Sequence, residues 1–273
     1  MKMPTHYMKN STQTILLIDG DILIYRAAAA VEKVIVWEED SCFPIASLAE
    51  AMAAFESQMD GILDHFKTKD PVIALSHLNN FRTKVYPAYK ANRIDKPKPV
   101  ARIPLQQWVA ENYYCYQRPG LEADDVLGIL STSTKILPKD QSRIIVSLDK
   151  DMQTIPGQYY NYKHDILYNI SQQDADYYHM LQTLIGDTAD GYPGCPGIGP
   201  KKAEAILSGL TSYEEMWPAV VAAFDKAGLS AEQALTQARI ARICRVTDYN
   251  FKKKEVKLWQ PPVSDTPPNL KST

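Results

Sequence analysis

The stretch Gly120–Asp125, GLEADD, places three carboxylates, those of Glu122, Asp124 and Asp125, directly before an apolar run. Acidic residues suit the first turn of a helix, where the helix dipole is positive and backbone N–H groups are free. Carboxylates this close also repel one another, and a fold keeps them only where solvent or a cation neutralises their charge. The stretch therefore predicts the start of a helix. A cation-binding site is the alternative interpretation of its three carboxylates.

Further acidic residues stand at comparable junctions along the chain. Asp19 ends the apolar run Thr14–Ile18, and Asp149 and Asp151 follow the run Arg143–Ser147. Ligands gather at the carboxyl ends of strands in doubly wound sheets, where Asp19 would stand. Asp-x-Asp spacing can aim two carboxylates at one spot, because residues i and i+2 share a face of an extended chain. The candidate acidic site comprises Asp19, Glu122, Asp124, Asp125, Asp149, Asp151, Asp187 and Asp190.

Short apolar runs alternate with helical patterns up to about residue 170. Strands are predicted at Thr14–Ile18, Pro71–Leu75, Tyr113–Tyr116 and Arg143–Ser147, with a hairpin over Gln158–Asn169 at the far edge of the sheet. Helical spacing predicts a helix over Leu48–Phe66, and another follows Asp21, which is interpreted as its cap. This alternation indicates an α/β fold with a mainly parallel twisted sheet and flanking helices.

Length and composition fit a globular chain of one large or two smaller domains, with 273 residues and 45% hydrophobic content. The formal net charge of −2 gives no global signature of nucleic-acid binding. Four scattered cysteines indicate thiols in a reducing compartment and neither a disulfide framework nor a zinc site. The sequence shows no signal peptide and no apolar run near the ~20 residues of a membrane span, so we expect a cytoplasmic protein.

A basic segment runs from Phe81 to Arg102, with seven cations against the single acid Asp95. Aromatic residues interleaved with the cations suit a nucleic-acid strand, whose phosphates bind cations and whose bases stack on rings. A solvated surface is the alternative. Three prolines in the segment, with Pro104 just after it, favour a mobile loop or partly helical arch over a long regular helix. The DNA-contact candidates in this segment are Arg82, Lys84, Tyr89, Lys90, Arg93 and Lys96.

Beyond about residue 172 the pattern turns helical, with a glycine- and proline-rich connector at Gly191–Pro200. Gly197 and Gly199 precede a helix that opens with Lys201 and Lys202, an arrangement that can offer backbone N–H groups and positive charge to a phosphate. An ordinary turn between helices is the alternative. A further surface helix is predicted over Ser230–Val246, and the proline-rich stretch 260–273 is expected to be disordered.

The acidic set is rich in oxygen ligands and the chain is poor in histidine, which suits Mg²⁺ or Mn²⁺. Two such ions about 4 Å apart form the usual clamp for in-line phosphodiester hydrolysis. The basic segment would then hold the phosphate. The residues alone therefore indicate phosphoryl transfer to water.

Five ordered motifs, LLIDGD, FRTKVYPAYKANR, GLEADD, SLDKD and GDTADGYPGCPGIGPKKA, resemble the flap endonuclease/5′→3′ exonuclease family of PIN-like nucleases. The ending, QARIARICRVTDYNFKKKEVKLWQP, further resembles the gene 6 exonucleases of short-tailed bacteriophages. The resemblance implies a PIN-like core over 1–178 with a basic arch at about 81–108. It also implies a helix-three-turn-helix (helix-hairpin-helix) subdomain over 179–259 that grips duplex DNA.

By motif, the resemblance assigns metal binding to the eight carboxylates named above. It places Lys90 and Arg93 at the scissile phosphate and an aromatic residue, here Tyr89, beside them. The turn from Gly197 to Lys202 would contact the duplex backbone, where backbone carbonyls hold K⁺. One departure concerns His77, which stands at or near a position where the family carries a metal-binding aspartate.

The implied activity is that of a Mg²⁺-dependent 5′→3′ exonuclease with structure-specific flap endonuclease activity. Its expected substrates are double-stranded and flapped DNA and RNA–DNA primer ends in phage replication and recombination. A monomer in the host cytoplasm, working beside separate replication proteins, is expected. Two alternatives remain: a PIN-type endoribonuclease, and a non-catalytic protein that binds branched DNA.

Overall fold

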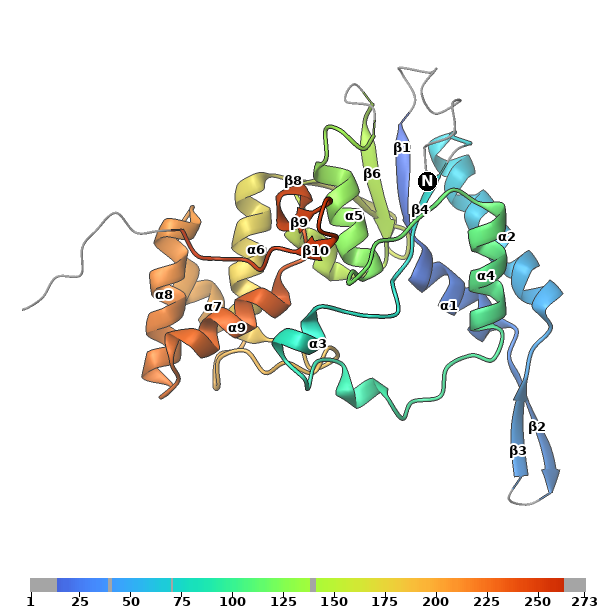
Figure 1. The fold of residues 1–273 in the computed structure, drawn as a ribbon, viewed down its shortest axis with the longest axis horizontal. Coiled ribbons are helices and arrows are strands. Elements are labelled where there is room, and N and C mark those ends of the chain that lie inside the picture. Colours follow the sequence, from blue (N-terminus) through green and yellow to red (C-terminus); the bar gives the residue numbers. More distant parts are fainter. Residues whose placement is uncertain (1–13, 39–40, 70, 138–140, 263–273) are drawn as a thin grey trace, which may run out of the picture. The chain divides into compact units, whose positions relative to one another are not determined.

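A computed structural model describes residues 14–38, 41–69, 71–137 and 141–262 of the chain. The chain forms two compact units (Figure 1). The first unit comprises Met1–Phe81, Asp95–Ile170 and Ile243–Lys257, and the second comprises Arg82–Ile94, Ser171–Arg242 and Leu258–Thr273. Neither unit is continuous in sequence, whereas the predicted division placed continuous segments at 1–178, 179–259 and 260–273.

A six-stranded sheet forms the centre of the first unit, with the order β5-β4-β1-β6-β7-β8. Its strands are β1 (Ile15–Asp19), β4 (Val72–Ala74), β5 (Cys115–Tyr116), β6 (Arg143–Ser147), β7 (Gly157–Asn161) and β8 (Ile166–Ile170). All neighbouring pairs are parallel except β7 and β8, which form an antiparallel hairpin at the edge. The prediction of a mainly parallel α/β sheet is confirmed, including the hairpin at its edge.

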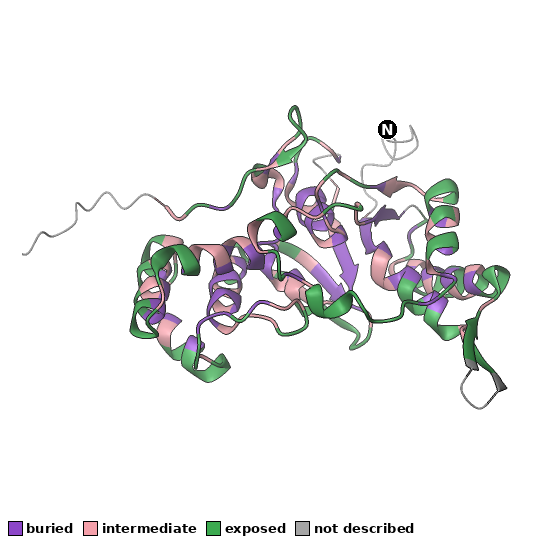
Figure 2. Ribbon diagram, turned by 60° about the horizontal axis from the view of Figure 1, so that its bottom comes forward, coloured by how far each residue is buried: buried purple, intermediate pink, exposed green. Residues whose placement is uncertain are grey.

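Helices cover both faces of this sheet. Those of the first unit are α1 (Gly20–Ala30), α2 (Leu48–Phe66), α4 (Arg102–Asn112) and α5 (Ala123–Thr132), with the short turns η3 (Lys150–Thr154) and η4 (Val246–Asp248). Alternate side chains of β1 enter different cores: Leu16 and Ile18 pack with α1, α2 and α4, and Leu17 packs with α5. Figure 2 shows the buried strands between partly exposed helices. The two neighbouring strands β1 and β4 are buried along their whole length, and both are apolar up to Asp19 because both of their faces are covered.

Sequence patterns did not predict a separate two-stranded sheet in the first unit. Its strands, β2 (Lys33–Glu38) and β3 (Ser41–Ile45), form a hairpin that extends beyond the neighbouring helices (Figure 1). Val34, Val36 and Phe43 remain exposed on it. Because apolar residues on both faces of a strand normally signal burial, the exposed hairpin departs from the usual pattern.

The second unit is helical. Its elements are α3 (Arg82–Val85), η2 (Ala91–Arg93), α6 (Gln172–Ile185), α7 (Pro200–Leu207), α8 (Tyr213–Lys226) and α9 (Ala231–Ala241). Met180, Leu184, Phe224 and Trp259 are among the residues of its core. As expected from the prolines, the described basic segment before Arg102 holds only short helical turns.

After α9 the chain returns to the first unit and adds a small hairpin, β9 (Tyr249–Asn250) with β10 (Glu255–Val256). The helix predicted over Ser230–Val246 was therefore too long, since α9 ends at Ala241. Arg242 and Arg245 are buried, not on a helix surface: Arg242 donates to the hydroxyl of Tyr213 and Arg245 to the carbonyl of Thr154. The end of the proline-rich stretch, 263–273, lies outside the described residues.

Candidate active site

Asp19 is the buried centre of the acidic site in the first unit. It ends β1 and caps α1, accepting a 3.2 Å hydrogen bond from the N–H of Ile22, while the hydroxyl of Ser147 donates to its other oxygen at 2.6 Å. The carboxyl group is only 3% exposed, and this burial, with the charges of Asp21 and Asp149, raises its pKa to about 7 despite both hydrogen bonds. A cation nearby would relieve that cost.

Asp21 is not the cap of α1, contrary to the prediction, because Asp19 holds that position. Instead its side chain lies in the first turn and accepts a 3.3 Å hydrogen bond from the N–H of Ser76, which follows β4. Burial raises the pKa of Asp21, and the charge of Glu122 raises it further. The charge of a carboxylate at the start of α5 therefore acts on a carboxylate in the first turn of α1.

Asp149 and Asp151 follow β6 as expected and begin the turn η3. The N–H of Asp149 donates to Ser147 at 3.1 Å, and Asp149 accepts a 2.8 Å hydrogen bond from the N–H of Asp151. Both carboxyl groups are half-buried. Ser147 therefore organises the site from its centre, because it contacts both Asp19 and the backbone of Asp149.

The GLEADD stretch starts α5, as predicted. Glu122 occupies the cap position, and Glu122 and Asp124 are half-buried. Asp125 differs, since it is fully buried and both of its oxygens accept from backbone N–H groups, those of Glu122 at 3.1 Å and Cys244 at 3.0 Å. In this conformation Asp125 joins α5 to the segment that returns after α9.

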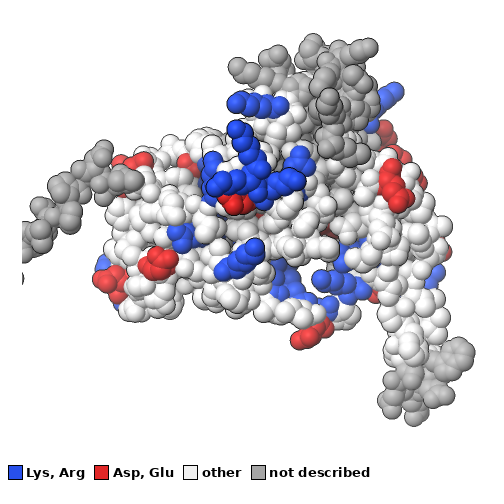
Figure 3. Space-filling view, viewed as in Figure 1, with Lys and Arg blue, Asp and Glu red and all other residues white. Residues whose placement is uncertain are grey.

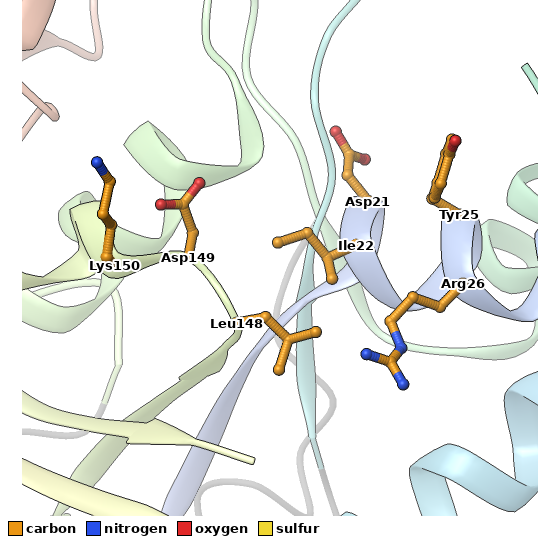
Figure 4. A pocket seen from close by; sticks show the side chains of 7 residues that line it. All are labelled: Asp21, Ile22, Tyr25, Arg26, Leu148, Asp149 and Lys150. Atoms are coloured by element: carbon orange, nitrogen blue, oxygen red, sulfur yellow. The ribbon is translucent and has the colours of Figure 1, made fainter. Parts of the chain in front are cut away.

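A pocket of about 630 Å³ opens beside these residues in the first unit. Asp21, Ile22, Tyr25 and Arg26 from α1 line it together with Leu148, Asp149 and Lys150. Figure 4 shows the carboxylates of Asp21 and Asp149 extending to the same side as the ring of Tyr25 and the ammonium of Lys150, while Arg26 extends the other way.

Sequence reasoning missed Tyr25, Arg26 and Lys150 as candidates. Two signals were available. Tyr25 lies four residues after Asp21, which puts both on one helix face, and Lys150 stands between two candidate aspartates. Arg26 also lies over the ring of Tyr162 at 5.7 Å.

Divalent cations fit the donors of this pocket, because its carboxylates, those of Asp21 and Asp149, are oxygen ligands whose charges raise the pKa of the nearby Asp19. Within the described ranges, no three His, Cys, Asp or Glu side chains stand close enough to hold a metal ion as they are placed. In the same ranges, no helix is long and apolar enough to cross a membrane.

Asp187 and Asp190 lie in the second unit, on a loop fixed by two glycines. Gly186 and Gly194 cross so closely that a Cβ on either would lie within 2.4 Å of the other's backbone nitrogen. Asp187 accepts from the N–H groups of Ala189 and Asp190 at 2.7 and 3.2 Å. The loop is therefore held by its own backbone.

The candidate phosphate-binding residues Lys90 and Arg93 both contact Asp190. Lys90 lies 3.6 Å from one oxygen of that carboxylate, and Arg93 forms a short ion pair with the other. Tyr89 donates from its hydroxyl to Asp190 at 2.9 Å. Asp190, a predicted metal ligand, is therefore paired in this structure with Lys90 and Arg93, the predicted phosphate contacts.

The other basic candidates separate into buried and exposed residues. Arg82 is 2% exposed, and its guanidinium donates to the carbonyls of Ile240, in the last turn of α9, and of Arg242, just after that helix, so in this structure it is a structural residue and not a surface contact. Tyr89 is also buried. Lys84 and Lys96 are exposed.

A helix, α7, follows the glycine-rich turn in the second unit, as predicted. Gly197 takes a φ of +75°, and Gly199 caps α7 with Pro200 in its first turn. The ammonium of Lys202 donates to the carbonyl of Gly197 at 2.9 Å, and Lys201 is exposed. His77, in the first unit, accepts from the N–H of Asn79 through its Nδ1 at 3.3 Å.

Solved structures share this fold. A mutant T5 5′-exonuclease matches with a TM-score of 0.60 and 14% identity, over 84% of this chain and 87% of that one. The T5 flap endonuclease, solved in a pseudo-enzyme-product complex with DNA and metal ions, matches with a TM-score of 0.61 and 15% identity, over 84% of this chain and 89% of that one. The fold is thus that of a class of nucleases.

Sequence comparison identifies the family to which the chain belongs. Residues 14–180 match the family model for the 5′-3′ exonuclease, N-terminal resolvase-like domain. The chain is 30% identical to the exonuclease of Escherichia phage T7, over 90% of this chain and 93% of that protein. Flap endonuclease Xni of Shewanella frigidimarina is 27% identical, over 85% of this chain and 89% of that protein. The chain belongs to the 5′-3′ exonuclease family and is a nuclease, so the resemblance is confirmed.

Proposed function

We propose that this nuclease is a Mg²⁺-dependent 5′→3′ exonuclease with structure-specific flap endonuclease activity on duplex DNA. The observation that carries the proposal is the buried carboxylate of Asp19 at the end of β1, joined through Ser147 to Asp149 at the end of β6, in a chain of this family. Mn²⁺ can substitute, because the donors are hard oxygens without a strict size requirement. Relatives named for exonuclease and flap endonuclease activity support both halves of the proposal.

We assign metal binding in the first unit to Asp19, Glu122, Asp124, Asp149 and Asp151, with Asp187 and Asp190 as candidate ligands in the second unit. Two bound ions would offset charge on the phosphate and activate water for its attack. Asp125 is among the candidate ligands by motif, but its contacts with two backbone N–H groups favour a role in positioning Glu122 and Asp124.

The chain's own residues bind and orient the substrate in this proposal. Lys90 and Arg93 bind the scissile phosphate once they leave Asp190, because a phosphate offers them a stronger charge than one carboxylate. In the pocket, Tyr25 presents a ring and Lys150 a cation to the terminal nucleotide. Backbone N–H groups and lysines of the Gly197–Lys202 turn bind the duplex backbone, and K⁺ would bind to carbonyls there.

In this proposal the substrates are double-stranded and flapped DNA and RNA–DNA primer ends. Phage replication and recombination require such processing, and the similarity to T7 and T3 nucleases supports that setting. We further propose a monomer in the host cytoplasm that works with separate replication proteins.

A substrate panel tests this proposal against its alternatives. Flapped duplex DNA, blunt duplex DNA, an RNA–DNA primer end and a structured RNA would be incubated with the protein and Mg²⁺. Cleavage of the DNA and primer substrates near their 5′ ends is expected. Cleavage of the structured RNA alone would identify an endoribonuclease, and tight DNA binding with no cleavage in any divalent metal would identify a binding protein.

A further inference from the structure

The first unit carries a basic surface whose residues have no role in the function proposed above. The residues from Asn250 to Lys257 include four lysines against the single acid Glu255. Figure 3 shows lysine and arginine side chains gathered where Figure 1 draws β9 and β10. We call Lys252, Lys253 and Lys254, which lie in the turn between these strands, the lysine turn.

The lysine turn is held in one conformation by its backbone. The side-chain oxygen of Asn250 accepts from the N–H groups of Lys252 and Lys253, each at 3.1 Å. The backbone carbonyl of Asn250 accepts from the N–H of Lys254 at 2.7 Å, and Lys254 adopts the left-handed φ of 57°. Adjacent cations are therefore presented together on a fixed turn, although they repel one another.

The base of the turn is anchored in the core. Tyr249 is buried, and its hydroxyl donates to the carbonyl of Pro119 at 3.3 Å. Phe251 packs against the Tyr249 ring edge-on, with 5.1 Å between ring centroids. At the other end the N–H of Lys257 donates to the carbonyl of Asp248 at 2.8 Å. The lysines therefore project from a turn whose two ends are fixed by contacts with the rest of the first unit.

The segment that precedes the lysine turn is hydrogen-bonded to α5, the helix at whose start Glu122 and Asp124 lie. Cys244 donates to Asp125 at 3.0 Å, and the N–H of Val246 donates to the hydroxyl of Thr132 at the end of α5 at 2.9 Å. Gly128 has no room for a side chain, since a Cβ would lie 2.3 Å from the carbonyl oxygen of Cys244. Glu122 and Asp124 at one end of α5 and the lysine turn are therefore parts of one packed body.

Arg118 adds a further positive charge near the lysine turn. It lies in the loop between β5 and α5, with its guanidinium over the ring of Tyr116 at 3.8 Å from the centroid. Burial raises the pKa of Tyr249, and the charge of Arg118 opposes that rise, which places Arg118 near the base of the lysine turn.

Little of this positive charge is neutralised by neighbouring carboxylates. Among the described residues, Lys253 with Glu255, at 3.6 Å, is the only ion pair formed by the four lysines, and both side chains are largely exposed. Such a pair is weak and gives way to a stronger anion. A nucleic-acid backbone, with regularly spaced phosphates and no need for base contacts, matches adjacent lysines on a rigid turn.

We propose that the lysine turn, with Arg118, is a further binding surface for the phosphate backbone of duplex DNA, additional to the Gly197–Lys202 turn of the second unit. The inference rests on the proposed function, because it assumes that the acidic site acts on DNA. The surface would bind a duplex independently of its sequence and would add affinity without taking part in hydrolysis.

Fluorescence anisotropy with a labelled duplex of about 20 base pairs, in EDTA and over a range of salt concentrations, tests the inference. In Lys252→Gln/Lys253→Gln protein we expect affinity roughly 3- to 10-fold lower near 0.1 M salt, and a slope of log affinity against log salt smaller in magnitude by about 2. Lys252→Arg/Lys253→Arg protein should bind as the wild type does, because arginine keeps the charge.

Lys69→Gln/Lys135→Gln protein is the matched control, because it loses the same charge at exposed positions before β4 and β6. A lysine-turn variant that equals this control in both affinity and salt slope overturns the inference. Cleavage by the wild type in Mg²⁺ is scored separately. Lysine-dependent binding without cleavage would therefore support the surface and contradict the proposed function.

Discussion

The hydroxyl of Ser147 donates a 2.6 Å hydrogen bond to the buried carboxylate of Asp19, which links the carboxyl ends of β6 and β1. This bond and the bond from Ile22 favour the charged form of Asp19, while burial opposes it more strongly. The protein therefore keeps a carboxylate where ionisation is costly for folding. We interpret that cost as stability given up for a metal ligand.

Asp19→Asn protein should be inactive but more stable without metal at pH 8. The pKa of Asp19 rises from its ordinary 3.8 to about 7 on folding, so its contribution to stability is full below pH 4 and lost as the pH rises through 7. Asparagine removes this loss, and we expect a gain of about 1–3 kcal/mol in unfolding free energy above pH 7. Urea unfolding in EDTA at pH 5 and 8 measures it.

Asp64→Asn is the control, because Asp64 is exposed on α2. It should change neither activity nor the pH dependence of stability. An Asp19→Asn protein less stable than the wild type at pH 8 would contradict the account of Asp19.

Arg93→Ala should separate binding of the scissile phosphate from folding. The Arg93 side chain is 44% exposed in its pair with Asp190, so its loss should cost less than about 1 kcal/mol of stability. Loss of a charge that contacts the reacting phosphate should slow single-turnover cleavage roughly 100-fold. Arg93→Lys, which keeps the charge, should retain more activity; equal losses in both variants would favour a structural role.

Gly128→Ala should destabilise the first unit by about 2–4 kcal/mol, because the new Cβ would meet the carbonyl oxygen of Cys244 at 2.3 Å. Gly61→Ala is its counterpart within α2, with no atom within 4 Å of the added carbon. That substitution should stabilise the protein by about 0.5–1 kcal/mol. Thermal unfolding of both variants compares them, and similar effects would show that α5 is not packed as described.

Removal of divalent metal should leave the melting temperature nearly unchanged. Each unit has an apolar core of its own, and backbone N–H and hydroxyl groups already donate to acidic residues such as Asp19 and Asp149. Calorimetry with and without chelator tests this expectation. A large loss of melting temperature in chelator would show that the ions are structural.

Local patterns predicted much of the fold and the site. The apolar runs before Asp19 and Asp149 identified two adjacent parallel strands, and the acids of GLEADD identified the start of α5. The contacts that sequence reasoning missed are distant ones. Asp125 accepts from Cys244, 119 positions away, and Arg82 donates to Ile240, 158 positions away. No local pattern distinguishes a ligand carboxylate or a surface cation from one that a remote backbone group requires.

Cleavage of a duplex with a 5′ flap, labelled at each end in turn, shows whether the protein is a metal-dependent nuclease that acts from 5′ ends. The reaction would compare the wild type in Mg²⁺, the wild type in EDTA, and Asp149→Asn/Asp151→Asn protein in Mg²⁺. The account predicts short products from the 5′ end in the first reaction and none in the other two. Products from the 3′ end, or cleavage that survives EDTA or the double substitution, would contradict it.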